Sequence, residues 1–232
     1  MTEPSQVTAR RRAVAVAGHA GDERSARAGL QDSEATVRAT ALGALARLGR
    51  LNATDLESAA GDRDPVVRAR AAELAGVGSE VGSEPGNEAA HGGSGGWIVA
   101  LLDDPVAMVV EAACFGLGEM GEATCRIEAA VETLGRVART HSDALCREAA
   151  VAALGAIGAD AGLEAVLAAM ADKPAVRRRA VLALAAFEGP EVEAALERAL
   201  ADRDWQVRQA AEDLTGQRET GPAGRPSRRA DG

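Results

Sequence analysis

The sequence predicts an all-α solenoid, in which paired antiparallel helices stack into one curved array. A short motif recurs along the 232-residue chain, and a period of about 30 residues is typical of stacked helical pairs. The chain is also rich in alanine, has 2% aromatic residues and lacks tyrosine. This composition suits closely packed helices, because alanine is the best helix former. The sequence has no strand pattern.

The repeated motif is an apolar residue followed by arginine. "VRATALGALARLG" from Val37 and "VRRRAVLALAAFEG" from Val176 both have alanine three residues after this arginine and leucine seven residues after it. Six copies follow one another, and their arginine position, here called the slot, holds Arg38, Arg68, Val110, Arg147, Arg177 and Arg208. A further copy around Arg10 predicts an N-terminal half-repeat.

Each period divides into a short first helix, an aspartate-rich turn and a second helix that carries the motif. The clearest first helices are expected around residues 22–32, 53–62, 162–172 and 191–202, with a longer one around 127–139. Turns are expected at Asp64-Pro65, Asp104-Pro105, Lys173-Pro174 and residues 202–204. Proline fits there because the first turn of a helix tolerates its missing N–H.

These elements predict the organisation of the chain. The expected segments are a tail at 1–6, the half-repeat and two repeats at 7–77, a flexible insert rich in Gly, Ser and Glu at 78–96, four repeats at 97–216 and a disordered tail at 217–232. Trp97 and Trp205 each lie near an expected helix start. We expect both rings to pack in the core between repeats.

With copies such as "DPVVRARAAELAGVG", the chain resembles the HEAT-like repeat family, specifically the short repeats of phycobilisome lyase-type proteins. The resemblance covers roughly residues 7 to 216. It implies an α-solenoid whose second helices line a concave face, and it implies a ladder of aspartate and arginine between repeats. It says little about function, because HEAT arrays serve many roles.

We interpret the slot arginines as structural. On a helical wheel Arg177 lies on the packed flank of its helix, whereas Arg178 and Arg179 point away and remain free to touch a partner. A half-buried guanidinium needs an acceptor, and an aspartate precedes most slot arginines by five or six residues.

The sequence therefore predicts a ladder of turn aspartates and slot arginines from the same or neighbouring repeats, with Asp172 as the partner of Arg177. Its expected members are Asp32, Arg38, Asp62, Arg68, Asp104, Arg147, Asp172, Arg177, Asp202 and Arg208. In this scheme Asp104 has lost its arginine at Val110, and His141 replaces the aspartate before Arg147.

The sequence offers no catalytic, cofactor-binding or metal-binding motif. His19, His91 and His141 form no metal-binding pair, and the His-Glu dipeptides that bind iron in HEAT-repeat hydroxylases are absent. "HGGSGG" from His91 lacks the flanking strand and helix of a phosphate-binding loop. We therefore expect no cofactor and no metal.

The three cysteines lack CxxC spacing and indicate reduced thiols. Cys114 and Cys146 are expected in the core, with Cys125 more exposed. A soft-metal site formed by His141 with Cys125 and Cys146 is the alternative.

The charge of the chain limits its partners. A net charge of −9 and a pI near 5.0 argue against a nucleic-acid binder, whose surface should be basic. No apolar run approaches the ~20 residues of a membrane span. We expect a cytoplasmic, monomeric protein with a protein partner.

The resemblance implies that outward positions of the second helices contact this partner. The candidate positions are Arg47, Arg70, Glu73, Glu111, Glu119, Glu148, Arg178, Arg179, Gln209 and Glu212. Their mixed signs suit a protein of complementary charge. The sequence thus favours a non-catalytic protein-binding scaffold or adaptor. The alternatives are a bilin lyase or lyase-associated chaperone of the phycobilisome lyase type and, behind it, a DNA-binding HEAT-like protein.

Overall fold

Every regular element in the computed structural model is helical over the residues that it describes, which are 4–76, 95–127 and 129–220. The α-helices of these ranges are α1 (Pro4–Ala20), α2 (Glu23–Gly29), α3 (Ala35–Arg47), α4 (Ala53–Ala60), α5 (Pro65–Leu74), α6 (Gly96–Ala100), α7 (Ala107–Glu119), α8 (Ala130–Thr140), α9 (Ala144–Ile157), α10 (Leu163–Ala169), α11 (Pro174–Ala183), α12 (Pro190–Leu200) and α13 (Trp205–Thr220). Short 3-10 helices are η2 (Leu101–Asp103), η3 (Gly121–Arg126), η4 (Asp160–Gly162) and η5 (Leu184–Ala186).

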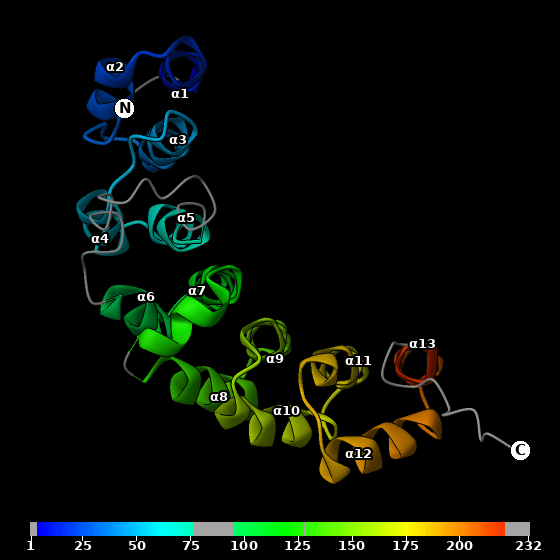
Figure 1. Cartoon of the computed structure of the whole chain (residues 1–232). Coiled ribbons are helices and arrows are strands. Elements are labelled where there is room, and N and C mark those ends of the chain that lie inside the picture. Colours follow the sequence, from blue (N-terminus) through cyan, green and yellow to red (C-terminus); the bar gives the residue numbers. More distant parts are fainter. Residues whose placement is uncertain (1–3, 77–94, 128, 221–232) are drawn as a thin grey trace, which may run out of the picture.

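The helices form two rows that curve together (Figure 1). The odd-numbered helices from α1 to α5 and from α7 to α13 form the inner row, where each packs on the next. The even-numbered helices form the outer row, each beside the inner helix that follows it in the chain. The predicted all-α solenoid is confirmed, and its second helices line the concave side (Figure 1).

Helix starts follow the turn signals in the sequence. The Asp64 side chain accepts a hydrogen bond from the N–H of Val66, and Pro65 is the first residue of α5. Asp143 caps α9 in the same way, through the N–H of Leu145. Asn52 forms a reciprocal capping box with Asp55 at the start of α4. These bonds satisfy N–H groups that a helix leaves unpaired at its first turn.

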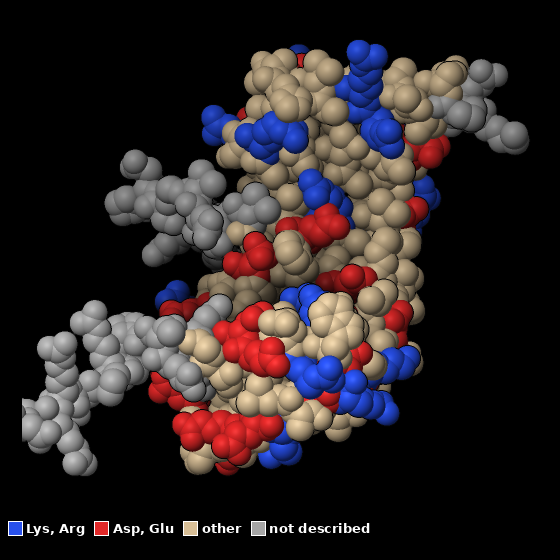
Figure 2. Space-filling view, turned by 90° about the vertical axis from the view of Figure 1, so that its right-hand side faces the viewer, with Lys and Arg blue, Asp and Glu red and all other residues tan. Residues whose placement is uncertain are grey.

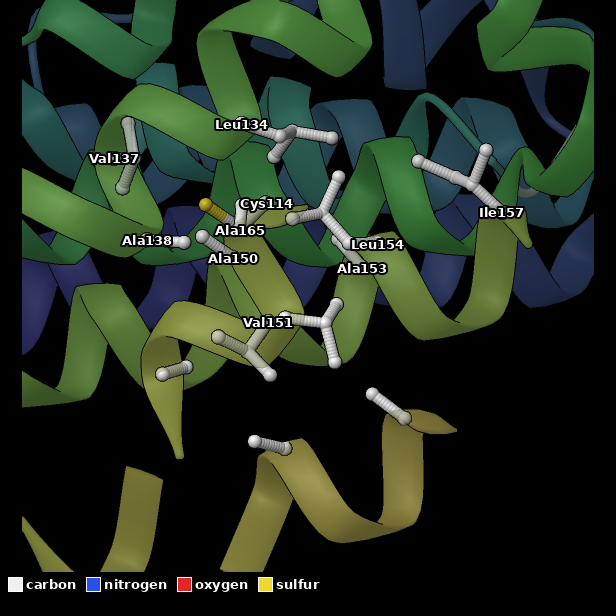
Figure 3. Packing of buried hydrophobic residues seen from close by; sticks show 14 of the residues in the cluster. Cys114, Leu134, Val137, Ala138, Ala150, Val151, Ala153, Leu154, Ile157 and Ala165 are labelled. Carbon is white, nitrogen blue, oxygen red and sulfur yellow. The ribbon is translucent and has the colours of Figure 1, made fainter. Parts of the chain in front are cut away.

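The core lies between the two rows and continues from repeat to repeat. Leu134 and Val137 of α8 face Val151 and Leu154 of α9, and Ala165 of α10 closes the layer (Figure 3). All five side chains are buried. Each repeat thus covers its apolar face with its neighbours, which explains why a chain with few large rings has a continuous core.

The structure differs from the sequence predictions at some boundaries and at one tryptophan. α1 begins at Pro4, inside the expected tail, and α13 continues to Thr220, beyond the expected start of the C-terminal tail. The predicted insert 78–96 lies outside the described residues except for Gly95 and Gly96. Trp97 packs against the core, but Trp205 is 65% exposed, so its core prediction was wrong.

Among the described helices, none is both long and apolar enough to cross a membrane.

Candidate functional site

Arginine–aspartate pairs connect successive repeats in the described part of the chain. In each pair the arginine Nε and Nη2 donate to the two carboxylate oxygens of an aspartate in the next repeat. The pairs, with their two distances, are Arg10/Asp32 (2.8 and 3.2 Å), Arg38/Asp62 (2.8 and 2.7 Å), Arg68/Asp104 (2.7 and 2.9 Å), Arg147/Asp172 (2.6 and 2.8 Å) and Arg177/Asp202 (2.9 and 2.7 Å). We call these five pairs the ladder.

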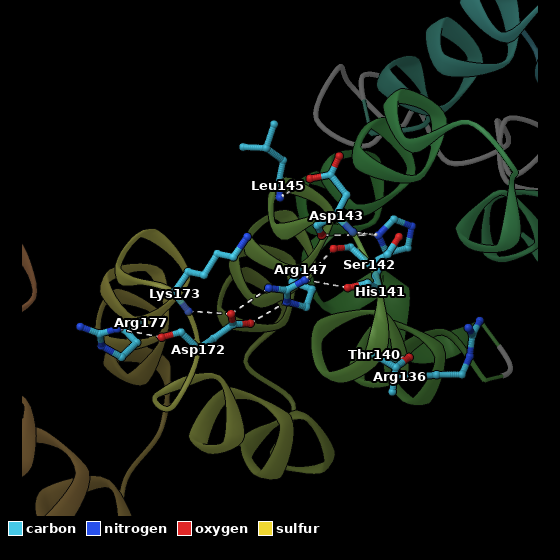
Figure 4. A network of polar contacts seen from close by, with 10 residues as sticks. All are labelled: Arg136, Thr140, His141, Ser142, Asp143, Leu145, Arg147, Asp172, Lys173 and Arg177. Atoms are coloured by element: carbon cyan, nitrogen blue, oxygen red, sulfur yellow. Dashed lines mark hydrogen bonds and ion pairs between the residues drawn. The ribbon is translucent and has the colours of Figure 1, made fainter.

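A third bond of the arginine reaches its own repeat. Nη1 of Arg177 donates to the backbone carbonyl of Asp172 at 2.7 Å, and Nη1 of Arg147 donates to that of His141 at 2.7 Å (Figure 4). One guanidinium therefore ties the turn of its own repeat to the turn of the next. The ladder fixes the relative position of neighbouring repeats.

The predicted pairing of Arg177 with Asp172 was wrong. The carboxylate of Asp172 binds Arg147 of the preceding repeat (Figure 4). Arg177 binds the carboxylate of Asp202 in the next repeat. Asp172 gives Arg177 its backbone carbonyl alone. The five- and six-residue offsets in the sequence thus mark a backbone contact, whereas the ion pair crosses to the next repeat.

The ladder is interrupted between α7 and α9. Asp104 keeps a partner, Arg68, so the expectation that it had lost its arginine was wrong. The missing pair would join Val110 to His141. Val110 is fully buried, and His141 Nδ1 accepts the N–H of Asp143 at 3.1 Å, as ladder aspartates accept the N–H two residues on. Because both charges are replaced together, neither is left unpaired at this junction.

Hydrogen bonds to arginine lower the pKa of the ladder aspartates. The bond from Arg147 is the largest cause for Asp172, and the bond from Arg177 is the largest cause for Asp202. Burial alone would raise the pKa of Asp62 and Asp104, but bonds from arginine and from a backbone N–H outweigh it. The ladder therefore favours the ionised carboxylates.

This predicts a loss of stability in acid. In the unfolded chain an aspartate has a pKa of about 3.9, and the pKa values of the ladder aspartates in the folded chain are lower. Between these pKa values the unfolded state binds more protons. The contribution of the ladder to stability is therefore complete above about pH 5 and is lost as the pH falls below about 4. An acid titration followed by circular dichroism should show this decline, and Asp202→Asn should make it shallower. Stability that rises between pH 5 and pH 3 would contradict the ladder.

The cysteines lie as expected. Cys114 and Cys146 are buried and Cys125 is exposed. Burial raises the pKa of Cys146 to about 11 and that of Cys114 still further. The Cys146 thiol donates to the carbonyl of Ala107 at 3.3 Å. Within the described residues no cluster of three or more His, Cys, Asp or Glu side chains could hold a metal.

Three adjoining hollows follow the inner helices on the concave side. The first lies between α1, α3 and α5, and it shares Gly43, Arg47 and Arg70 with the second, between α3, α5 and α7. The third, of about 450 Å³, lies between α7, α9 and α11 and shares Phe115 with the second. Together they form one depression, which we call the concave groove.

Charge changes along the concave face. Basic side chains gather over its N-terminal end and acidic side chains follow below them (Figure 2). His19, Arg47 and Arg70 line the first hollow. Glu111, Glu119 and Glu148 line the third, together with Arg179.

The predicted partner-binding residues all lie on inner helices. Arg47, Glu111, Glu119, Arg178, Gln209 and Glu212 are exposed, and Arg70, Glu73, Glu148 and Arg179 are half-buried. Two pairs are engaged with each other, Arg70 with Glu73 at 2.8 Å and Arg179 with Glu148 at 3.4 Å. Arg179 is therefore not free, contrary to the prediction, whereas the neighbouring Arg178 is exposed.

Glu212 has a different position from the other nine. It lies four residues after the slot, where Val14 and Leu42 pack against the next repeat. In the described part of the chain no repeat covers this position of α13, and Glu212 is exposed there.

Sequence reasoning missed the exposed apolar residues of the groove. Phe115 is 54% exposed and Leu145 is 58% exposed. A comparison of equivalent positions would have found Phe115, because it is the aromatic residue among the residues five positions after the slot. The other copies have Ala15, Gly43, Glu73, Ala152, Leu182 and Asp213 there.

Part of the chain matches a known repeat family. Residues 96–175 match the family described as HEAT repeats. A search of curated proteins by sequence gave no significant match. The matched segment includes the interrupted junction between α7 and α9.

Solved structures resemble the whole array. Two engineered proteins align with TM-scores of 0.65 and 0.61 at 20% and 19% identity, over 86% and 84% of this chain and 99% and 97% of theirs. The X-ray structure of Escherichia coli YibA aligns with a TM-score of 0.58 at 16% identity, over 84% of this chain and 70% of that protein. At these identities the likeness shows the fold alone, an α-solenoid of repeated helix pairs.

Proposed function

We propose that this protein is a non-catalytic scaffold or adaptor that binds a protein partner along the concave groove. The observation that carries the proposal is the pair of exposed apolar side chains, Phe115 and Leu145, in a groove lined by carboxylates and a guanidinium. Aromatic side chains in a hollow surrounded by polar groups are typical anchors of protein interfaces.

The ion pairs between neighbouring repeats support the same function. Each ladder arginine donates two hydrogen bonds to an aspartate of the next repeat, and the groove runs across several of those repeats. A surface that is already ordered loses less conformational entropy when it binds. Such a face suits an extended partner that contacts several helices at once.

Affinity capture from the native cell extract tests this function with matched single substitutions. Phe115→Ala removes an exposed apolar side chain of the concave groove on inner helix α7, and Leu200→Ala removes one on the outer helix α12. We expect the wild type and the Leu200→Ala variant to retain the same defined protein, and the Phe115→Ala variant to lose most of it. Equal capture by both variants would place the binding surface elsewhere.

A further inference from the structure

We propose that the third hollow of the concave groove recognises a partner segment in which an apolar side chain is flanked on both sides by lysine or arginine. The inference rests on the proposed function and adds the chemistry of the segment. It follows from the order of side chains along α7 and α9.

Helix α7 presents an acidic, an aromatic and a second acidic side chain in one line. Glu111, Phe115 and Glu119 are four residues apart, so they lie on the same side of the helix, about 6 Å from one to the next. All three are exposed and line the hollow. Within the described residues neither Glu111 nor Glu119 forms an ion pair, which leaves both carboxylates for a partner.

Helix α9 supplies an apolar floor beside this line. Leu145, Ala149, Ala152 and Ala156 follow one another at spacings of four, three and four residues, and all of them line the hollow. Their small side chains leave room over the helix, while Leu145 at its first turn is 58% exposed. An apolar side chain of the partner would contact Phe115 and this floor.

The charge of the hollow selects the flanking residues. Its lining contains Glu111, Glu119, Glu148 and one arginine, and that arginine already lies 3.4 Å from Glu148. The carboxylates of Glu111 and Glu119, one on each side of Phe115, therefore remain without a counter-charge in the described part of the chain. Lysine or arginine on both sides of an apolar anchor complements this pattern, whereas an acidic segment would be repelled.

A library of random peptides displayed on phage, selected on the immobilised full-length protein, tests the proposal. We expect enriched peptides to have an apolar residue between basic ones. The basic residues should lie two positions away if the segment is extended and about four away if it is helical. An enriched peptide, labelled and measured by fluorescence anisotropy, should bind about tenfold more weakly to Phe115→Ala, with Leu200→Ala on the outer row as the matched apolar control.

Two double variants distinguish binding at the third hollow from non-specific attraction to an acidic protein. Glu111→Gln with Glu119→Gln should weaken binding about tenfold, whereas Glu193→Gln with Glu197→Gln on α12 changes net charge equally and should have little effect. Equal weakening by both pairs would overturn the proposal.

The outcomes also separate the proposal from the proposed function. Enriched acidic or neutral peptides that still need Phe115 would overturn the basic chemistry and leave groove binding intact. Peptides that bind independently of every groove variant would overturn both.

Discussion

Arg177→Ala is expected to lower the free energy of unfolding by about 3 kcal/mol, because removing one partner of a buried ion pair leaves the other charge uncompensated. Arg177 is 5% exposed and binds both carboxylate oxygens of Asp202 and the carbonyl of Asp172. Alanine leaves the Asp202 carboxylate, itself largely buried, without its guanidinium. Denaturant unfolding followed by circular dichroism measures the loss.

Arg178→Ala is the matched control, because the neighbouring residue makes the same change on the same helix. Arg178 is exposed, and surface substitutions of this kind change stability by about 0.5 kcal/mol or less. A double-mutant cycle with Asp202→Ala then isolates the pair. Equal losses for Arg177→Ala and Arg178→Ala, or additive losses in the cycle, would show that the ladder does not stabilise the stack.

Gly116→Ala is expected to destabilise the protein by about 2 kcal/mol, as extra atoms in a filled interface do. A Cβ atom at Gly116 would lie 2.1 Å from the carbonyl oxygen of Ala72 and 3.0 Å from Cδ1 of Ile98. The nearer atom belongs to the backbone of the adjacent inner helix and cannot turn aside as a side chain could. α5 and α7 would have to move apart, and the resulting loss of stability would appear as a lower midpoint of thermal unfolding.

The same substitution at Gly216 in α13 is its control. A Cβ there would meet nothing within 4 Å, and alanine is a better helix former than glycine by about 1 kcal/mol. We expect Gly216→Ala to leave stability unchanged or slightly raised. A Gly116→Ala protein as stable as this control would mean that the inner helices are not in close contact.

Most of the fold could be predicted from the repeat period in the sequence. The motif at Val37 and Val176 has apolar residues at helical spacing, and prolines and aspartates mark the turns, so local sequence and tertiary packing agree. The boundaries of α1 and α13 were less predictable, because their polar terminal turns resemble tails.

The ladder partners could not be derived from spacing alone. Asp172 lies five residues before Arg177 and Asp202 lies 25 residues after it. Other slot arginines likewise have one aspartate shortly before them and another in the next repeat. The choice depends on how neighbouring turns approach in space. The sequence held one clue to the correct partners. Val110 replaces the arginine of one repeat and His141 replaces the aspartate of the next, as expected if each arginine binds the aspartate of the following repeat.

The position of the candidate site was more predictable than its chemistry. The outward positions of the second helices followed from the resemblance to HEAT-like repeats, and all ten candidates lie on inner helices. Phe115 and Leu145 were overlooked because an apolar residue in an apolar helix is expected to be buried in the core. Their exposure arises where neighbouring inner helices present small residues such as Gly118 and Ala152.

A photo-crosslinking amino acid at position 115, compared with the same amino acid at position 200, tests most directly whether the concave groove binds a protein. Both native residues are exposed apolar side chains, one on inner helix α7 and the other on outer helix α12. After irradiation of living cells, position 115 should yield a discrete crosslinked protein, weakened by Glu111→Gln with Glu119→Gln, and position 200 should not. A crosslink from position 200 with none from position 115 would contradict binding at the concave groove.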